Sequence, residues 1–460
     1  MRVFNTLTRE VQELVPQQDN KLKIYACGPT VYNFIHIGNG RAACVFDTLR
    51  RYLIWRGYDV TFVQNFTDID DKVIKKANEE GTTYEVIAER YINEYWKDAD
   101  GLGIMRADVH PKATENIDMI LEIIAGLIEK GHAYATPAGD VYFDVHSFHE
   151  YGKLSHQPLE ELESGARIAP GEEKRDPMEF AVWKAAKPGE PYWESPYGHG
   201  RPGWHIECSA MVRRFLGDTA DIHCGGQDLI FPHHENEIAQ SECCNGKPFA
   251  NYWVHNGYVN VDNRKMSKSL GNFFTVRDVA AEYGYGVIRL FAISAHYRSP
   301  INFSRDIMDQ CKASLERLRT CRENLAFAIG NAAEGSDELI AKANARRDQF
   351  IAVMDEDLNT ANGLTALFEL ASDINSAKGQ SKAALEYAAD MFDQLSGVLG
   401  LFLAPKAEEI PAEIVAMAEQ RTAARKARDF ALADSLRDQI AAAGYLLEDT
   451  PQGPKLSRKQ

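Results

Sequence analysis

The chain has 460 residues, too many for one ordinary domain, so we expect two to four. Its composition, with 45% hydrophobic and 26% charged residues, is that of a globular protein. The net charge of −16 argues against broad nonspecific binding to nucleic acid. It does not exclude a local basic face, because charges are screened beyond about 8 Å at physiological salt.

The first ten residues, MRVFNTLTRE, lack an apolar signal segment, and no apolar run is long enough to span a bilayer. We therefore expect a cytoplasmic protein with no membrane partner. The eight cysteines are scattered, which predicts reduced thiols with a few metal ligands among them.

The first elements predict a β–α–β unit. Residues 22–27 (LKIYAC) read as a buried strand, residues 40–56 have apolar positions at helical spacing, and residues 59–65 read as the next strand. This order favours a parallel sheet, in which ligands bind at the carboxyl ends of the strands. The segments 28–40 and 65–72 lie at that edge.

The rest of the chain divides into segments that differ in composition and in hydrophobic periodicity. Residues 115–132 predict a helix, and the segment up to about 203 is rich in turns, so we expect an insertion at about 115–203. Long amphipathic patterns follow at 309–329 and 336–402. The expected domains are an α/β catalytic domain at 1–305, a helical bundle at 306–403 and a small C-terminal unit at 404–460.

Four scattered side chains could bind a metal. If 231-FPHHENEIAQSE-242 begins a helix with Pro232 in its first turn, His233 and Glu237 stand at i and i+4 on one face. Cys208 and Cys27, at the end of the first strand, complete a set of zinc-type donors. Their spacing is not that of a zinc ribbon, so two buried thiols beside a polar helix face is the alternative.

The segment 265-KMSKS-269 places two lysines between turn-forming residues. Ammonium groups in such a loop could stabilise the charge that develops on phosphates during nucleotidyl transfer. A solvated basic turn is the alternative for this run by itself. Upstream, 36-HIGN-39 opens a helix at the switch point of the sheet, where a helix N-terminus favours anions.

These two motifs, in this order, resemble the ATP site of class I aminoacyl-tRNA synthetases. The stretches 27-CGPTVYNFIHIGNGR-41, 65-NFTDIDDK-72, 203-GWHIECSAM-211, 231-FPHHENEIAQSE-242 and 265-KMSKSLGN-272 are similar to cysteinyl-tRNA synthetases. The resemblance implies a Rossmann-like parallel-sheet catalytic domain with an insertion and a loop region at about 255–305. It also implies an α-helical bundle and a C-terminal anticodon-binding unit.

The resemblance also implies the site. One Zn²⁺ per chain would be held by Cys27, Cys208, His233 and Glu237 and would bind the substrate thiolate, which serine lacks. ATP with Mg²⁺ would meet His36, Asn39, Lys265 and Lys268, and L-cysteine would meet Thr67 and Trp204. His205 and His223 are expected at the pocket wall. Many class I enzymes have histidine where Asn39 stands, and Cys224 stands where we expect glycine, as a spectator thiol.

The C-terminal unit has arginines on one helical face, which by themselves are typical of a solvated helix. By resemblance it contacts the anticodon of tRNA(Cys), through Arg425, Phe430, Asp434 and Asp449. The implied enzyme is a cysteine–tRNA ligase, expected as a monomer. One alternative is a cysteine ligase on the same scaffold with a small amine acceptor, which would not need residues 405–460. The other is a non-catalytic zinc- and tRNA-binding relative, which would not need the 265–269 loop.

Overall fold

The computed structural model describes residues 1–157, 173–266, 272–332, 334–403, 411–450 and 453–458. Two compact units are present. The first comprises Met1–Leu315, Gln349–Thr365 and Gly397–Leu401, and the second comprises Glu316–Asp348, Ala366–Ser396 and Phe402–Gln460. No helix in the described part of the chain combines the length and the apolar character needed to cross a bilayer.

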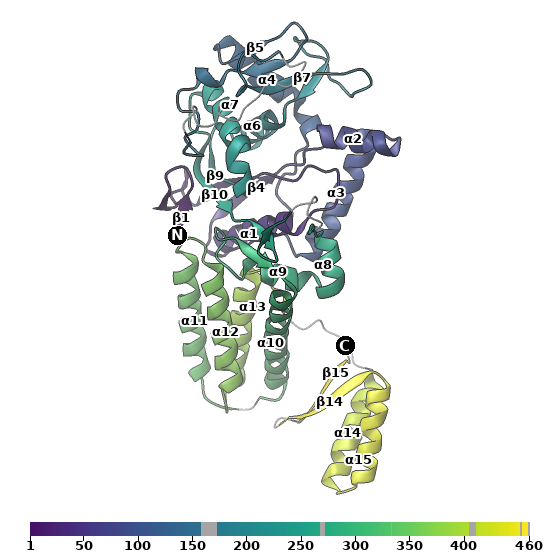
Figure 1. Cartoon of the computed structure of the whole chain (residues 1–460). Coiled ribbons are helices and arrows are strands. Elements are labelled where there is room, and N and C mark those ends of the chain that lie inside the picture. Colours follow the sequence, from purple (N-terminus) through teal and green to yellow (C-terminus); the bar gives the residue numbers. More distant parts are fainter. Residues whose placement is uncertain (158–172, 267–271, 333, 404–410, 451–452, 459–460) are drawn as a thin grey trace. The chain divides into compact units, whose positions relative to one another are not determined.

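A four-stranded parallel sheet forms the centre of the first unit, with strand order β10-β9-β3-β4. Figure 1 labels its strands β4, β9 and β10. The strands are β3 (Lys21–Ala26), β4 (Asp59–Gln64), β9 (Ala220–Gly226) and β10 (Ala250–Asn256). The register pairs Ile24 with both Phe62 and Ile222. The predicted β–α–β unit and parallel pairing are confirmed, and the carboxyl ends of β3, β9 and β10 meet at one edge.

Helix α1 (Ile37–Trp55) connects β3 to β4. Of the apolar positions predicted from helical spacing, Phe46, Leu49 and Leu53 are buried and Ala43 is partly buried. The helix begins within the 36–39 segment that was predicted to open it, because His36 caps it, and Gly57, with φ of 90°, follows its end. Helices α2 (Asp71–Glu80) and α3 (Tyr84–Gly101) follow β4.

Helices α6 (Trp204–Phe215) and α7 (Glu235–Asn245) pack against the sheet. Met211 and Ile238 share one core cluster with Tyr25 of β3 and Trp253 of β10. Burying such side chains stabilises the fold by about 1.5–3 kcal/mol each. This packing places the first turns of α6 and α7 beside the carboxyl edge of β3.

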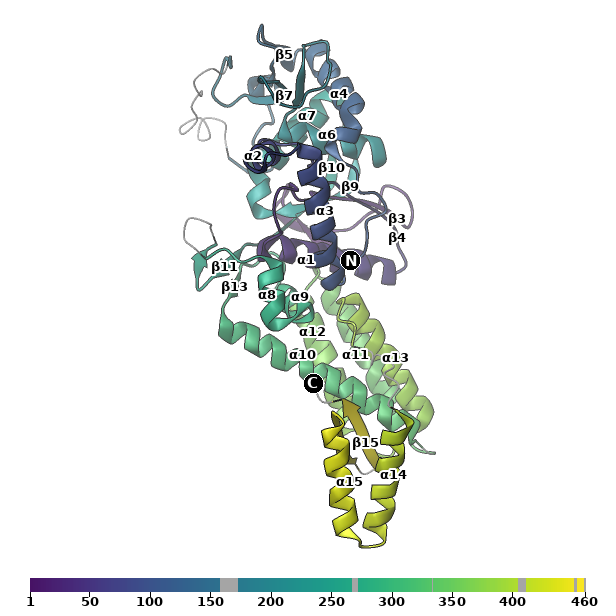
Figure 2. The ribbon, with the colours of Figure 1, turned by 90° about the vertical axis from the view of Figure 1, so that its right-hand side faces the viewer.

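The insertion folds as a small antiparallel sheet, β5-β6-β7-β8, next to α4 (Ile117–Glu129). Its strands are β5 (Ala133–Ala135), β6 (Val141–Phe143), β7 (Phe180–Ala185) and β8 (Gly200–Pro202). Figure 2 shows α4 and this sheet on the side of α6 and α7, and their cores are continuous through Ile206 and Ala239. The chain therefore returns from the insertion directly into α6.

Short elements at the N-terminus and after β10 complete the first unit. They are β1 (Arg2–Asn5), β2 (Glu10–Glu13), β11 (Val259–Val261), β12 (Arg264–Lys265), α8 (Val276–Tyr283), α9 (Tyr285–Ile293) and β13 (Ile301–Phe303). Strand β11 pairs with β12 and with β13. Helix α9 packs on α1, where Arg289 pairs with the buried Asp47 at 2.6 Å.

Four long helices follow: α10 (Arg305–Gly330), α11 (Glu338–Met354), α12 (Thr360–Ser376) and α13 (Lys382–Val398). Within the second unit, Arg322 of α10 pairs with Asp393 of α13 at 2.7 Å, and Arg346 of α11 pairs with Asp373 of α12 at 2.8 Å. The amphipathic patterns therefore form packed helices, as predicted.

The C-terminal segment contains α14 (Ala412–Lys426), α15 (Phe430–Ala442) and a hairpin of β14 (Tyr445–Thr450) and β15 (Gly453–Arg458). Ile414, Ala418, Ile440 and Leu447 form its core. The sequence pattern did not indicate this hairpin. Residues 404–410, at the start of the expected C-terminal unit, lie outside the described residues.

Candidate metal and nucleotide site

Four donor side chains converge at the carboxyl edge of the sheet. Cys27 directly follows β3, Cys208 lies in α6, and Glu237 lies in α7. The Cys27 Sγ–Cys208 Sγ distance is 3.9 Å, and Cys27 Sγ lies 3.6 Å from Glu237 Oε1. His233 Nε2 lies 3.7 Å from Cys208 Sγ and 2.8 Å from Glu237 Oε1. The four side chains predicted from sequence are thus brought together, although Cys27 and Cys208 are 181 residues apart in the sequence.

His233 reaches this position through the helical turn that leads into α7. Within the turn Ile230–His234 only Phe231 has non-helical angles, with φ of −137° and ψ of 134°. Pro232 and His233 therefore belong to the first helical turn, which runs directly into α7 at Glu235. The expected i, i+4 relationship between His233 and Glu237 is confirmed, with a π-type first turn in place of a regular α-helical one.

The spacing of these donors fits a tetrahedral zinc ion. Zinc–sulfur bonds of about 2.3 Å place two sulfurs about 3.8 Å apart, close to the 3.9 Å between Cys27 and Cys208. A sulfur and an imidazole nitrogen would be about 3.5 Å apart, close to the 3.7 Å between Cys208 and His233. His233 and Glu237 are closer because they share a hydrogen bond. All four donor atoms lie within 4.8 Å of one another.

Two further histidines join the cluster, and the sequence analysis did not include them as donors. Cys27, His223, His234 and Glu237 form a second set whose donor atoms all lie within 4.8 Å of one another. His223 Nε2 contacts Glu237 Oε2 at 2.8 Å, and His234 Nε2 lies 3.2 Å from Cys27 Sγ. The available signals were the adjacent histidines of 231-FPHHENE-237 and the place of His223 near the end of β9.

Electrostatics prepare the cluster for a cation. Burial would raise the pKa of Glu237, but His223 and His233 outweigh it and hold that pKa well below its usual range. The hydrogen bond from Cys27 lowers the pKa of Cys208 to about 6, whereas burial raises the pKa of Cys27. Burial opposes protonation of His233, but Glu237 and Cys208 raise its pKa to about 10. Glu237 and Cys208 are therefore favoured as anions, whereas Cys27 and His233 would each release a proton when a metal binds.

A cleft of about 540 Å³ opens beside these donors. Its wall contains residues from the ends of β3, α1, α6, β9 and β10, among them Cys27, His36, Asn39, Trp204, Asp228 and Tyr258. The metal donors and the first turn of α1 thus share one cavity. A helix N-terminus in such a cleft favours an anionic ligand.

His36 and Asn39 form a capping box at the start of α1. The Nδ1 of His36 accepts hydrogen bonds from the backbone N–H groups of Gly38 and Asn39, at 3.1 and 3.2 Å. Because Nδ1 is an acceptor, a neutral His36 carries its proton on Nε2. Both predicted residues line the cleft.

The segments on either side of the 265–269 loop are anchored to the start of α1. Thr275 forms an antiparallel bridge with His36, and the ring of Phe273 meets the His36 ring at 5.3 Å between centroids. Met266 and Phe273 both line the cleft. Lys265 ends β12, and Lys268 lies outside the described residues. Met266, in the described part of the second motif, therefore lines the same cleft as His36 and Asn39, and the position of Lys268 stays a prediction.

The two predicted amino-acid-pocket residues lie near the metal donors. The Trp204 ring is half-exposed in the cleft and stacks on His233 with centroids 4.3 Å apart. Thr67 is buried, and its Oγ1 donates to Glu207 Oε2 at 2.9 Å. Burial raises the pKa of Glu207. The sequence analysis missed Glu207, although it directly precedes Cys208 in 205-HIEC-208.

Two remaining predictions concern cysteine and histidine side chains. Cys224 is fully buried on β9, and burial raises its pKa, so its thiol stays protonated. His205 is half-buried, and its Nδ1 contacts His233 Nδ1 at 2.9 Å. The spectator role expected for Cys224 agrees with this burial.

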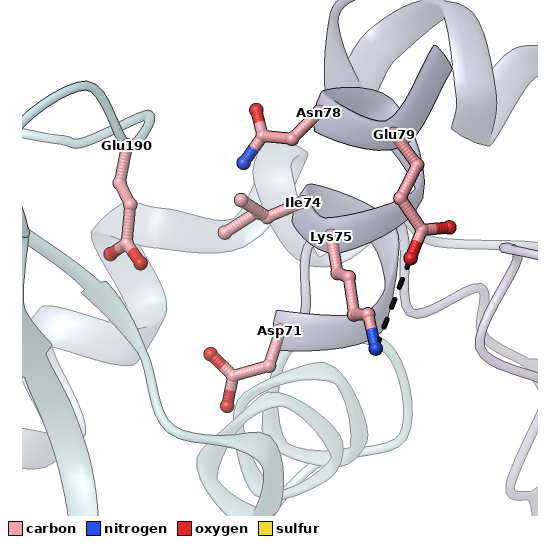
Figure 3. A pocket seen from close by; sticks show the side chains of 6 residues that line it. All are labelled: Asp71, Ile74, Lys75, Asn78, Glu79 and Glu190. Atoms are coloured by element: carbon pink, nitrogen blue, oxygen red, sulfur yellow. Dashed lines mark ion pairs between the residues drawn. The ribbon is translucent and has the colours of Figure 1, made fainter.

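A second, shallower groove of about 450 Å³ lies along α2 (Figure 3). Figure 3 shows Asp71, Glu79 and Glu190 around it, with Lys75 paired to Glu79. Asp71 also pairs with Lys184 at 3.0 Å and with Arg201. These carboxylates are engaged with basic side chains, and the groove contains none of the donors described above.

In the C-terminal segment, two residues predicted to contact tRNA contact each other. Asp449 of β14 accepts hydrogen bonds from Arg421, at 2.8 and 3.0 Å, and from Arg425 at 2.5 Å. The Arg421 hydrogen bonds are the largest cause that lowers the pKa of Asp449 to about 2. Phe430 is 61% exposed, and Asp434 is also exposed. Arg421 is thus buried in a structural pair, which the basic-face pattern did not indicate.

The parallel sheet, the cleft at its carboxyl edge and the helices that follow define a class I aminoacyl-tRNA synthetase. The sequence matches the family described as "tRNA synthetases class I (C) catalytic domain" over residues 13–313, and the DALR domain over residues 349–404. Cysteine–tRNA ligases of Caldicellulosiruptor saccharolyticus and Anoxybacillus flavithermus are 53% and 54% identical to it. These matches cover 100% of this chain and 100% and 99% of the relatives. The chain belongs to the cysteine–tRNA ligase family.

Solved structures agree on the fold. A methionyl-tRNA synthetase of Mycobacterium tuberculosis bound by methionyl-adenylate matches with a TM-score of 0.61 at 14% identity, covering 83% of this chain and 92% of that one. A LeuRS–tRNA complex of Agrobacterium radiobacter K84 matches with a TM-score of 0.60 at 12% identity, covering 85% of each chain. At this identity the similarity concerns architecture alone.

Proposed function

We propose that this chain attaches L-cysteine to tRNA(Cys) in two steps, with ATP as the energy source. In the first step the carboxylate of cysteine attacks the α-phosphate of ATP, forming cysteinyl-adenylate and releasing pyrophosphate. In the second step a hydroxyl of the terminal adenosine of the tRNA attacks the cysteinyl carbonyl, the acyl–phosphate bond breaks, and AMP leaves. The observation that carries this proposal is the shared cleft, in which thiol-binding chemistry at Cys27 adjoins the capped N-terminus of α1.

We assign the metal to the set Cys27, Cys208, His233 and Glu237 rather than to the set with His223 and His234. Zinc prefers thiolate ligands, and only the first set contains both cysteines. A zinc ion held there would bind the substrate thiolate as an additional, fifth ligand. His223 would then hold the second carboxylate oxygen of Glu237, since outer hydrogen bonds commonly orient metal ligands.

Selectivity against serine follows from this donor chemistry. A hydroxyl is a far poorer zinc ligand than a thiolate, because its proton is much harder to remove. An apolar pocket would discriminate such near-isosteres by only about 10–200-fold. Trp204, stacked on His233, and Thr67, held by Glu207, would form the walls against the remainder of the amino acid.

For ATP we propose the first turn of α1 and the 265–269 loop. The backbone N–H groups at the start of α1 and the Nε2–H of His36 would face the phosphates, with Asn39 beside them. Lys265 and Lys268 would stabilise the charge on the α-phosphate and the departing pyrophosphate. Mg²⁺ would enter as the ATP complex. Positioning and charge stabilisation account for most of the rate enhancement in such transfers.

For tRNA we propose the C-terminal segment as the anticodon-binding part. The exposed ring of Phe430 could stack on an unpaired base, with Asp434 and one face of the Arg425–Asp449 pair beside it. We further propose that the protein acts as a monomer in the cytoplasm. Size-exclusion chromatography with light scattering tests the first of these two points.

The test is charging of tRNA(Cys) by the purified protein with ATP, Mg²⁺ and labelled cysteine. We expect cysteinyl-tRNA to form and serine in large excess not to reduce it. Failure to charge tRNA, together with cysteine-dependent pyrophosphate exchange, would contradict the transfer step and favour a small amine acceptor. Failure in both assays would overturn the proposal as a whole.

A further inference from the structure

Arg41 carries a buried positive charge behind the nucleotide side of the cleft. It lies in the second turn of α1, is 1% exposed, and has no acidic partner among the described residues. Its two terminal nitrogens donate instead to backbone carbonyl groups of two segments. Nη1 donates to Gly257 O at 2.7 Å and to Tyr258 O at 2.9 Å. Nη2 donates to three carbonyls, at 3.3, 3.2 and 2.6 Å: His296, Tyr297 and Ser299.

The first of these segments is a wall of the cleft. Gly257 and Tyr258 follow β10, line the cleft, and precede β11 and β12, which lead into the 265–269 loop. Arg41 therefore ties this wall to α1 only two residues after Asn39. The position of residues 257–258 therefore also affects the position of β12, where the loop starts.

The second segment, residues 296–299, supports the wall from behind. A Cβ atom on Gly257 would meet Arg298 O at 2.6 Å, so the two segments are in close contact. From the β9 side, Gln227 donates through Nε2 to the same Arg298 O at 3.2 Å. Gln227 stands between Gly226 and Asp228, which also line the cleft. One guanidinium thus holds both segments together behind the cleft.

We infer that Arg41 is a positioning residue for the ATP subsite, holding the 257–258 wall in register with the first turn of α1. The inference rests on the proposed function, because it assumes that ATP binds in this cleft. A guanidinium is suited to this role, since its planar fork presents five N–H donors from three nitrogens in a fixed geometry, whereas an ammonium group has three donors on one nitrogen and cannot span carbonyls of both segments in the same way. A buried charge is costly without a counter-charge, and the bound triphosphate would supply one at the adjoining helix terminus.

The test compares Arg41→Lys with the wild-type protein in cysteine-dependent pyrophosphate exchange, varying ATP and cysteine separately. We expect KM for ATP to rise by about tenfold or more while KM for cysteine changes by less than about twofold, because lysine keeps the charge and loses the fork. Zinc content should be unchanged. Equal KM values for ATP in the two proteins, or parallel changes for both substrates, would overturn the inference.

Arg289→Lys is the matched control. Arg289 is equally buried, lies in α9, and donates to the carbonyls of Leu399 and Leu102, but neither of these lines the cleft. We expect this variant to lower the melting temperature without a selective rise in KM for ATP. A selective rise in the control would contradict the special role of Arg41.

A second variant keeps the inference testable if Arg41→Lys does not fold. Gln227→Ala leaves Arg41 in place and removes only the hydrogen bond to the 296–299 segment, so we expect a selective rise of about threefold in KM for ATP. No rise would count against the inference. Wild-type protein without any cysteine-dependent exchange would instead overturn the proposed function, which separates the two failures.

Discussion

His36 and Asn39 cap each other across the first turn of α1. The His36 ring accepts from the Asn39 N–H at 3.2 Å, and the Asn39 side-chain oxygen accepts from the His36 N–H at 3.3 Å. Asparagine therefore does at position 39 what the third residue of a capping box does elsewhere. The exchange fixes the orientation of the His36 ring and leaves its Nε2 as the proton-bearing atom.

Asn39→Ala removes one half of this exchange. We expect a loss of about 0.5–2 kcal/mol in the free energy of unfolding and a lower rate of pyrophosphate exchange, because the His36 backbone N–H loses its acceptor. Asn39→Asp is the informative partner: a carboxylate can still accept the bond, so stability should be retained. Its charge should raise KM for ATP more than the alanine variant does. A fully stable, fully active alanine variant would contradict the capping role.

Cys208→Ser should lose zinc. Serine oxygen is a poor zinc ligand at neutral pH, so metal content measured by mass spectrometry should fall from about one per chain to well below half. Cys224→Ala is the control, since Cys224 is buried close by on β9 but belongs to neither donor set. It should keep its metal. Unchanged zinc in Cys208→Ser would remove that cysteine from the site.

The variants His233→Ala and His234→Ala show which of the two donor sets binds the metal. If Cys27, Cys208, His233 and Glu237 hold the metal, the first variant should lose zinc and the second should retain most of it. Loss of an outer contact typically lowers metal affinity by about 10–100-fold, so loss of His233 as a ligand should lower it further than loss of His234 does. The reverse result would assign the metal to the set that contains His223 and His234.

Thr67→Val tests the buried contact with Glu207. Valine keeps the shape but removes the hydroxyl that donates to Glu207 at 2.9 Å, so we expect a loss of about 1–3 kcal/mol in stability. KM for cysteine should rise while KM for ATP stays near the wild-type value. Thr67→Ser keeps the hydroxyl and should behave like the wild type. If the serine variant also fails, the methyl group rather than the hydrogen bond is what matters.

His110 gives the fold a predictable pH dependence. Burial lowers its pKa to about 4, and the ring packs between Phe66 and Trp96 while accepting from the Ala107 N–H at 2.9 Å. Its unfolded pKa is about 6.5, so below that pH the unfolded chain binds more protons than the folded chain. The stability that the neutral ring contributes is thus complete above about pH 6.5 and is lost progressively toward pH 4.

Thermal melts of wild type and His110→Gln between pH 7 and pH 5 check this. The contribution of one such group approaches about 1.4 kcal/mol per pH unit and is reduced here because the ring is partly exposed. Other buried histidines titrate in both proteins, so the readout is the difference between the two proteins in how far the melting temperature falls from pH 7 to pH 5. The variant should melt lower at pH 7 but lose less on acidification. Equal losses in both proteins would exclude His110 as a source.

The sequence by itself determined the local elements and the chemistry of the site. The β–α–β order, the spacing in α1 and the paired motifs predicted a parallel sheet with a nucleotide cleft, because period and order are local properties of a chain. The four metal donors could also be proposed from the sequence, because zinc binds only a few types of side chain.

Only the tertiary structure decided which side chains surround those donors. His223 and His234 join the cluster because β9 and the turn before α7 meet at one edge, a contact that no spacing encodes. Arg41 donates hydrogen bonds to two segments that are more than 200 residues away in the sequence. In the sequence alone it looks like any other polar residue of a helix. Long-range packing sets such partners, and a linear pattern contains no information about which distant carbonyls will face a given side chain.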